Sequence, residues 1–162
     1  MIITRGQGGR GYSPVGATHP NFVISHHSIP SHYTLWQSEG IRLSISPITL
    51  ACQPLLAGIK HLNRLEQVLV KHSLAQTRYD DVIVCDTHNQ IIETSVGNLF
   101  WYKNDSWYTP SLMESGVDGV MRNQILLVME ENGLSCEVVK QDVSDLFTAQ
   151  ELFVCNSLMV MV

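Results

Sequence analysis

The strongest constraint on the fold is a pair of hairpin patterns between residues 82 and 109. Two apolar runs, 82–85 and 90–93, flank the turn sequence Asp-Thr-His-Asn. A second pair of runs, 98–102 and 106–109, flanks Lys-Asn-Asp in the same way. Apolar runs joined by short polar turns are typical of β-hairpins. This region therefore predicts successive antiparallel strands.

Two main helices are expected around these hairpins. The first, at 61–76, would place Leu62, Leu65, Val68 and Leu69 on one side. The second, at 119–132, would end at Gly133, where a glycine commonly follows a helix. The remaining pattern gives strands at 21–27, 41–46, 135–140 and 151–155, a helical turn at 144–146 and a glycine-rich loop at 5–20. The predicted fold class is α+β, a mixed α/β arrangement with mostly antiparallel strands.

The composition is that of a single globular domain covering residues 1–162. Of the 162 residues, 44% are hydrophobic and 15% are charged, which is enough to bury a core. The formal net charge is −5 and there is no basic run, so nucleic-acid binding is not expected. Neither a signal peptide nor a membrane-spanning stretch is found, so we expect no membrane partner and a cytoplasmic location.

The cysteines and histidines give no metal motif. The four cysteines stand far apart, and no Cys-x-x-Cys pair occurs. Cys85 and Cys155 lie in apolar strand-like runs, so we expect buried, reduced thiols. His26 and His27 would face opposite sides of a strand and could not easily share an ion. The sequence therefore predicts no metal site.

Both ends of the chain are apolar. It begins with Ile2-Ile3-Thr4 after the first methionine and stops in Leu158-Met159-Val160-Met161-Val162. Domains usually end in exposed polar segments. We therefore expect this chain to be a piece of a longer protein.

The segment that starts at Lys60 is the most specific stretch of the sequence. It reads Lys-His-Leu-Asn-Arg-Leu-Glu-Gln, and it is followed by a strand that ends at Glu93 and by Asn98-Leu99-Phe100. This order resembles the fold-type IV pyridoxal-phosphate enzymes. Within them, the eight residues that start at Lys60 are similar to a motif of the 4-amino-4-deoxychorismate lyase family. The resemblance implies the large domain of these enzymes, without their small N-terminal domain and extreme C-terminus.

The resemblance gives Lys60 and Glu93 the central roles. Lys60 would hold pyridoxal 5'-phosphate as a Schiff base and then move protons. A lysine at the first turn of a helix faces the positive end of the helix dipole, which disfavours its charged form. Glu93 would keep the pyridine nitrogen protonated. From position alone, both are expected to be solvent-exposed charges at the ends of elements, and it is the surrounding sequence that favours the site. Asn98 would orient Glu93 or nearby backbone, or form an Asx turn.

The cofactor phosphate is expected where a loop runs into the second helix. Free backbone N–H groups at a helix N-terminus bind phosphate well, and Asp118 would be the N-cap there. The resemblance places the phosphate on Gly119, Val120 and Met121. It adds a second contact at Asn156 and Ser157, whose alternative is a polar turn.

The glycine-rich loop contains Arg10 and Tyr12. Its glycine spacing differs from the dinucleotide fingerprint and no helix follows, so we reject nucleotide binding. By resemblance, this loop lies near the substrate carboxylates, where Arg10 would provide a bidentate contact and Tyr12 a further donor. A flexible surface loop is the alternative.

The resemblance implies a lyase that converts 4-amino-4-deoxychorismate to 4-aminobenzoate and pyruvate in folate biosynthesis. It also implies a homodimer. Two alternatives remain open at this point. One is a D-amino-acid or branched-chain aminotransferase, which would use the same Lys60 and Glu93. The other is a folded fragment without catalytic activity.

Overall fold

The computed structural model describes residues 1–162, and the contacts divide them into two compact units. The first unit, Met1–Pro30, is an antiparallel ribbon of β1 (Ile2–Thr4) and β2 (Asn21–Val23). The predicted strand at 21–27 is thus shorter than expected. Between the two strands lies the glycine-rich loop, as predicted.

One glycine in this loop is needed for steric reasons. Gly6 has φ +96°, and a Cβ there would lie 1.8 Å from the carbonyl oxygen of His19. A side chain at this position would be strained in its backbone and would also meet main-chain atoms. The close approach of Gly6 to His19 brings the two ends of the loop together.

The second unit, Ser31–Val162, contains a three-stranded sheet in the order β3-β4-β5. Its strands are β3 (Leu43–Ile45), β4 (Asp81–Cys85) and β5 (Ile91–Thr94). The β3 strand pairs with β4 in parallel, and β4 pairs with β5 as an antiparallel hairpin. This hairpin is the first of the two that the sequence predicted.

The same unit contains a five-stranded sheet in the order β10-β9-β6-β7-β8. Its strands are β6 (Asn98–Lys103), β7 (Ser106–Pro110), β8 (Cys136–Val139), β9 (Glu151–Asn156) and β10 (Val160–Met161). All neighbours are antiparallel except β7 and β8. The second predicted hairpin, β6-β7, is therefore confirmed, as is the mostly antiparallel pairing.

Three α-helices and one 3-10 helix complete this unit: α1 (His32–Glu39), α2 (Leu65–Leu74), α3 (Val120–Glu131) and η1 (Val143–Thr148). The prediction of two main helices missed α1. This helix has no acidic residue in its first turn and no side-chain cap, and Tyr33 is its one buried residue. It therefore has little of the periodicity by which a helix is recognised. Gly133, with φ +70°, follows α3 as predicted.

The first predicted helix was wrong in its start, and the side on which its leucines lie is not the buried one. The α2 helix begins at Leu65, and it is Val70 and Leu74 that it buries. Leu62, Leu65, Val68 and Leu69 are all exposed, with Leu65 72% accessible. Val70 and Leu74 pack against Val82 and Val84 of β4 in one apolar cluster. The helix therefore presents an apolar stripe away from the sheet.

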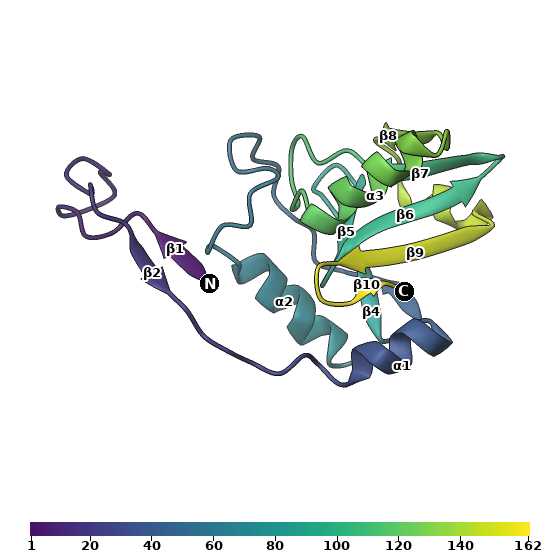
Figure 1. The fold of residues 1–162 in the computed structure, drawn as a ribbon, viewed down its shortest axis with the longest axis horizontal. Coiled ribbons are helices and arrows are strands. Elements are labelled where there is room, and N and C mark those ends of the chain that lie inside the picture. Colours follow the sequence, from purple (N-terminus) through teal and green to yellow (C-terminus); the bar gives the residue numbers. More distant parts are fainter. The chain divides into compact units, whose positions relative to one another are not determined.

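The core is centred on β6. Leu99, Phe100 and Trp101 are completely buried. Successive side chains of a strand face opposite sides of the sheet. Leu99 and Trp101 accordingly share one cluster, while Phe100 packs with Met129 of α3 in another. The α3 helix lies along the sheet near β9, as Figure 1 shows.

The thiols fit the prediction. All four cysteines are free, and Cys85 and Cys155 are buried. Burial raises the pKa of Cys155 to about 12 and that of Cys85 to about 11. Both thiols are therefore held in the protonated, unreactive form at neutral pH. None of the helices has the length and apolar character needed to cross a bilayer.

Candidate functional site

Glu93 is a buried carboxylate of the second unit with a strongly raised pKa. It lies on β5 and is 7% exposed. Burial raises its pKa from the ordinary 4.5 to about 7, while the Val117 N–H acts in the opposite direction. The positive charges of Arg64 and Lys60 also lower the pKa of Glu93, by smaller amounts. No basic side chain forms a salt bridge with this carboxylate. A cation bound against it would therefore relieve a real electrostatic cost.

Glu93 and Asn98 hold the same peptide segment from two sides. The Val117 N–H donates to Glu93 Oε2 at 2.9 Å. The Asn98 Nδ2 donates to the Val117 carbonyl oxygen at 2.8 Å. Asn98 thus positions neighbouring backbone, one of the two roles expected for it. Because both side chains are buried, Val117 is fixed beside the Glu93 carboxylate.

The segment that carries Lys60 joins the same place. Gly58 forms a parallel bridge with Val117, in which the Gly58 N–H donates to Gly116 and the Asp118 N–H donates to Gly58. Lys60 follows two residues later with an exposed side chain. The backbone therefore brings the neighbourhood of Lys60 to the peptides that Glu93 holds.

Lys60 is not in the first turn of a helix, so that part of the prediction was wrong. The α2 helix starts five residues later, at Leu65. Arg64 explains the delay, because its guanidinium donates to the carbonyl oxygens of His61, at 2.8 Å, and Ile59, at 2.9 Å. These bonds hold residues 59–64 in an irregular conformation. The helix dipole therefore cannot be used to explain the chemistry of Lys60.

Arg64 is a site residue that the sequence reasoning missed. It belongs to the Lys-His-Leu-Asn-Arg motif, and the motif by itself gives this arginine no particular role. In the structure it both shapes the Lys60 segment and acts on the charge of Glu93. The available signal was its place in the most specific stretch of the chain, four residues after Lys60.

The start of α3 meets Asn98. Gly119 is the N-cap residue, and no side chain caps this terminus. A Cβ on Gly119 would lie 2.1 Å from Asn98 Oδ1, so only glycine fits without moving that buried amide. Val120 and Met121 form the first turn with their N–H groups directed out of the helix start. The predicted phosphate-binding residues thus adjoin Asn98 and Val117.

Asp118 was expected to cap this helix, and that expectation was wrong. Its carboxylate instead binds Arg122 Nη1 at 2.9 Å and Asn123 Nδ2 at 3.2 Å. The N-cap position falls one residue later, at Gly119. The backbone N–H groups at the helix start are therefore left without a side-chain acceptor.

Asn156 and Ser157 lie at the end of β9. Asn156 Nδ2 donates to the Val96 carbonyl oxygen at 3.0 Å, which places this turn against the β5-β6 connection. Asn156 Oδ1 accepts from the N–H groups of Leu158 and Met159. The Asn156 side chain is fully used in building the turn. Ser157 is exposed within it.

Arg10 and Tyr12 belong to the first unit, in the loop between β1 and β2. Both side chains are exposed, and neither forms a hydrogen bond or ion pair. Their predicted contact with substrate carboxylates stays a prediction.

A cavity of about 220 Å³ lies between the segment that precedes α2 and residues 114–116. Three of its lining side chains, His61, Gln67 and Ser115, each have a buried polar atom without a partner. Neither Lys60 nor Glu93 lines it. His61, which follows Lys60, is thus turned toward this cavity.

Comparison with known proteins identifies the class to which these features belong. The family model of class IV amino-transferases matches residues 1–162. The chain therefore belongs to the class IV amino-transferase family, which confirms the predicted mixed α/β fold of the fold-type IV enzymes. This is the class of pyridoxal-phosphate enzymes that the sequence around Lys60 resembled.

Within that class, the chain is similar to lyases in particular. It is 45% identical over 157 residues to an aminodeoxychorismate lyase from Vibrio harveyi, covering 97% of this chain and 58% of that protein. The crystal structure of 4-amino-4-deoxychorismate lyase from Pseudomonas aeruginosa superposes with a TM-score of 0.93 at 35% identity, covering 98% of this chain and 59% of that one. The resemblance to this lyase family is confirmed.

An aminotransferase relative is more distant. A putative branched-chain-amino-acid aminotransferase from Methanocaldococcus jannaschii is 29% identical over 160 residues, covering 97% of this chain and 54% of that protein. The chain thus spans a little over half the length of the relatives it matches.

Proposed function

We propose that this chain provides the cofactor-binding part of a pyridoxal-phosphate-dependent lyase that converts 4-amino-4-deoxychorismate to 4-aminobenzoate and pyruvate. The observation that carries the proposal is Glu93, a buried carboxylate with a pKa of about 7 that forms no salt bridge with a basic side chain. The similarity to the Vibrio harveyi lyase, at 45% identity, supports the choice of reaction.

The residues around Glu93 fit pyridoxal phosphate. A protonated pyridine nitrogen is a cation that would satisfy the buried carboxylate. The uncapped start of α3 at Gly119, Val120 and Met121 offers N–H donors to a phosphate. The backbone of Asn156 and Ser157, at the neighbouring turn, would add a second contact. Asn98 would hold Val117, and with it Glu93, in position relative to the pyridine nitrogen and the phosphate.

Each remaining residue has a defined part in the proposed reaction. When bound, pyridoxal phosphate supplies an electron sink for the carbon that bears the substrate amine. Lys60 would provide the amine that holds the cofactor and would act as the base that takes the proton from that carbon. Glu93 keeps the charge of the ring nitrogen in place. Arg10 and Tyr12 would bind the two carboxylates of the substrate.

The same-fold alternative is an aminotransferase, since Lys60 and Glu93 would serve both reactions. The identity to the lyase, 45%, exceeds the 29% to the putative aminotransferase over a similar span. We therefore favour the lyase. Formation of 4-aminobenzoate without a keto-acid acceptor would distinguish it from an aminotransferase acting on branched-chain or D-amino acids.

Attachment of the cofactor gives the most direct test. We expect borohydride treatment of the chain with pyridoxal phosphate to label one tryptic peptide, the one that contains Lys60. Lys60→Ala should remove that label completely. Lys71→Ala is the matched control, because Lys71 is an exposed lysine on α2. It should leave labelling unchanged.

Other labelling patterns would argue against the proposal. Label spread over several lysines would show that the chain has no cofactor site. A folded chain that takes up no label at all would favour the fragment without catalytic activity. In both cases circular dichroism establishes that the protein is folded.

Assembly as a homodimer is a further part of the proposal. The exposed stripe of Leu65, Val68 and Leu69 on α2 supports it, because apolar side chains three and four residues apart form one continuous patch. We expect the double variant Val68→Glu, Leu69→Glu to weaken dimerisation at least about tenfold. Sedimentation equilibrium measures this, with Leu127→Glu, an exposed leucine of α3, as the control. A wild-type chain that stays monomeric at high concentration would contradict the proposal.

A further inference from the structure

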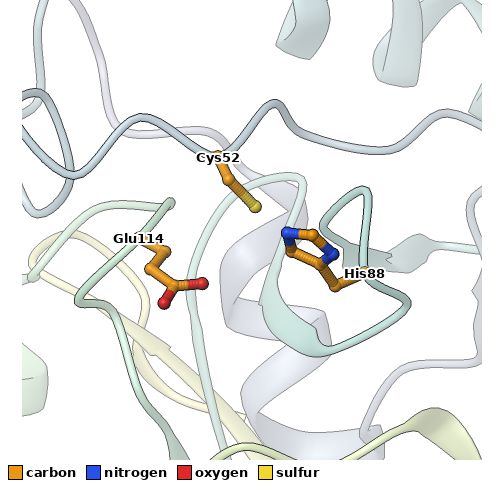
Figure 2. A group of neighbouring side chains, drawn as sticks. All are labelled: Cys52, His88 and Glu114. Atoms are coloured by element: carbon orange, nitrogen blue, oxygen red, sulfur yellow. The ribbon is translucent and has the colours of Figure 1, made fainter.

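Three side chains of different chemistry converge at one point of the second unit. They are Cys52, from the loop before Lys60, His88, from the β4-β5 turn, and Glu114, from the loop before Gly116. One ligand atom from each lies within 4.8 Å of the others. Figure 2 shows the sulfur, the imidazole and the carboxylate pointing toward a common centre. We propose that these residues bind a divalent metal ion, zinc in particular.

The three segments are held together by their backbones. The Gln53 N–H donates to the Glu114 carbonyl oxygen at 2.7 Å, next to two of the ligands. The Thr87 N–H donates to the Leu50 carbonyl oxygen at 3.1 Å, which ties the turn to the loop. The convergence of the side chains therefore follows from main-chain geometry, and little ordering is left for an ion to impose.

Asp86 fixes the position of His88. Asp86 Oδ1 accepts from the N–H groups of His88, at 2.8 Å, and Gln90, at 2.9 Å. Its other oxygen, Oδ2, accepts a hydrogen bond from the Cys52 thiol at 3.4 Å. Asp86 thus holds the backbone of the turn that carries His88 and also contacts the Cys52 thiol.

The local charge suits a divalent cation. When Cys52 gives up its thiol proton on binding the ion, its thiolate, Glu114 and the buried Asp86 give three negative charges around the centre. Lys140 Nζ contributes one positive charge through its 2.6 Å contact with Glu114 Oε1. The remaining charge of minus two matches that of the ion. Lys140 is half-exposed at its side chain and can withdraw into solvent when the ion binds.

The set of donors selects the metal. Sulfur, imidazole nitrogen and carboxylate oxygen together are the ligands of zinc, whereas calcium and magnesium prefer oxygen alone. Three protein ligands leave the fourth position of a tetrahedron for water. The bound ion would link the loop before Lys60 to the loop before Gly116. The inference does not depend on the proposed lyase reaction.

Cobalt(II) tests the site directly, because a thiolate ligand gives a charge-transfer band in the near ultraviolet and tetrahedral coordination gives strong visible bands. We expect the chain, reduced and without cofactor, to take up one equivalent of cobalt with both features, and zinc to displace it. Cys52→Ser should abolish the charge-transfer band. His88→Ala and Glu114→Gln should each weaken binding at least about tenfold.

Two matched controls use residues outside the cluster. Cys136→Ser changes a half-buried cysteine of β8, and His72→Ala changes an exposed histidine of α2. Both variants should bind cobalt like the wild type. Lys140→Gln should tighten binding several-fold, because a positive charge next to the ion is removed.

The proposal fails if wild-type chain gives no charge-transfer band at saturating cobalt. It also fails if the band survives in Cys52→Ser, since the thiolate would then come from another cysteine. A thermal shift gives an independent readout that does not rely on the spectrum. Zinc should raise the Tm of the wild type and of Cys136→Ser but not of a folded Cys52→Ser. An equal shift in all three would overturn the assignment.

Discussion

Replacing Glu93 with glutamine should make the cofactor-free chain more stable at pH 8, by up to about 3 kcal/mol, and leave its stability unchanged at pH 4. The reason is that Glu93 is buried and has a pKa of about 7, compared with 4.5 for an exposed glutamate. Glutamine has the shape of the protonated acid and can still accept the Val117 N–H.

The direction of this stability change follows from the difference in proton binding between the folded and the unfolded chain. Between pH 4.5 and 7, folded Glu93 holds its proton while the unfolded chain has released it. Stability due to this group is therefore full below pH 4.5 and falls as the pH rises to 7. Above pH 7 the folded state contains a buried carboxylate without a salt-bridge partner. Glutamine removes this cost, so the difference between variant and wild type should grow over that interval.

Urea unfolding at several pH values measures the difference, with Glu137→Gln as the control. Glu137 is an exposed glutamate of β8, and its replacement should give no pH-dependent change. A Glu93→Gln effect of equal size at pH 4 and pH 8 would contradict the argument. Pyridoxal phosphate should stabilise the wild type more than Glu93→Gln, because the ring nitrogen needs the carboxylate charge.

The local parts of the fold could be predicted because their causes are local. The β4-β5 and β6-β7 hairpins follow from turn residues between apolar runs, and Gly133 ends α3 through its positive φ. The position of Lys60 could not be predicted in the same way. Its conformation depends on where the Arg64 side chain goes, and a helical pattern does not reveal that.

The apolar pattern also could not predict which side of α2 is buried. Its leucines are exposed, while Val70 and Leu74 meet β4. Two stripes of the helix are apolar, and only the tertiary fold decides which of them faces the sheet. An apolar stripe can equally serve an interface, so periodicity alone could not assign it.

The candidate site could be predicted as residues but not as contacts. Glu93, Asn98 and Gly119 were named from the family motif, yet Glu93 and Asn98 are linked through Val117, whose peptide has no sequence signature, and Gly119 lies against Asn98. The proposed metal ligands are a stronger case, because Cys52, His88 and Glu114 come from separate segments without any ligand spacing. Only the folded backbone brings them together.

Arg122→Ala should destabilise the chain by about 2–4 kcal/mol, the second large effect we expect. Arg122 is buried on α3, and its guanidinium donates to Pro110 O at 3.0 Å, Asp118 Oδ1 at 2.9 Å and Thr109 Oγ1 at 3.3 Å. Truncation would leave the Pro110 carbonyl without its donor and a void beneath the helix.

The loss should reach the proposed phosphate site as well, because Arg122 fixes Asp118 next to Gly119 at the helix start. Arg122→Lys should recover only part of the stability, since one ammonium cannot replace a planar group with three partners. Arg78→Ala, at an exposed arginine without hydrogen-bond partners, should change the unfolding free energy by less than about 0.5 kcal/mol. Equal unfolding free energies for Arg122→Ala and Arg78→Ala would show that the guanidinium does not anchor α3 to the end of β7. The α3 helix would then be positioned by Asn98 at its start and by the packing of Met129, near its end, against Phe100.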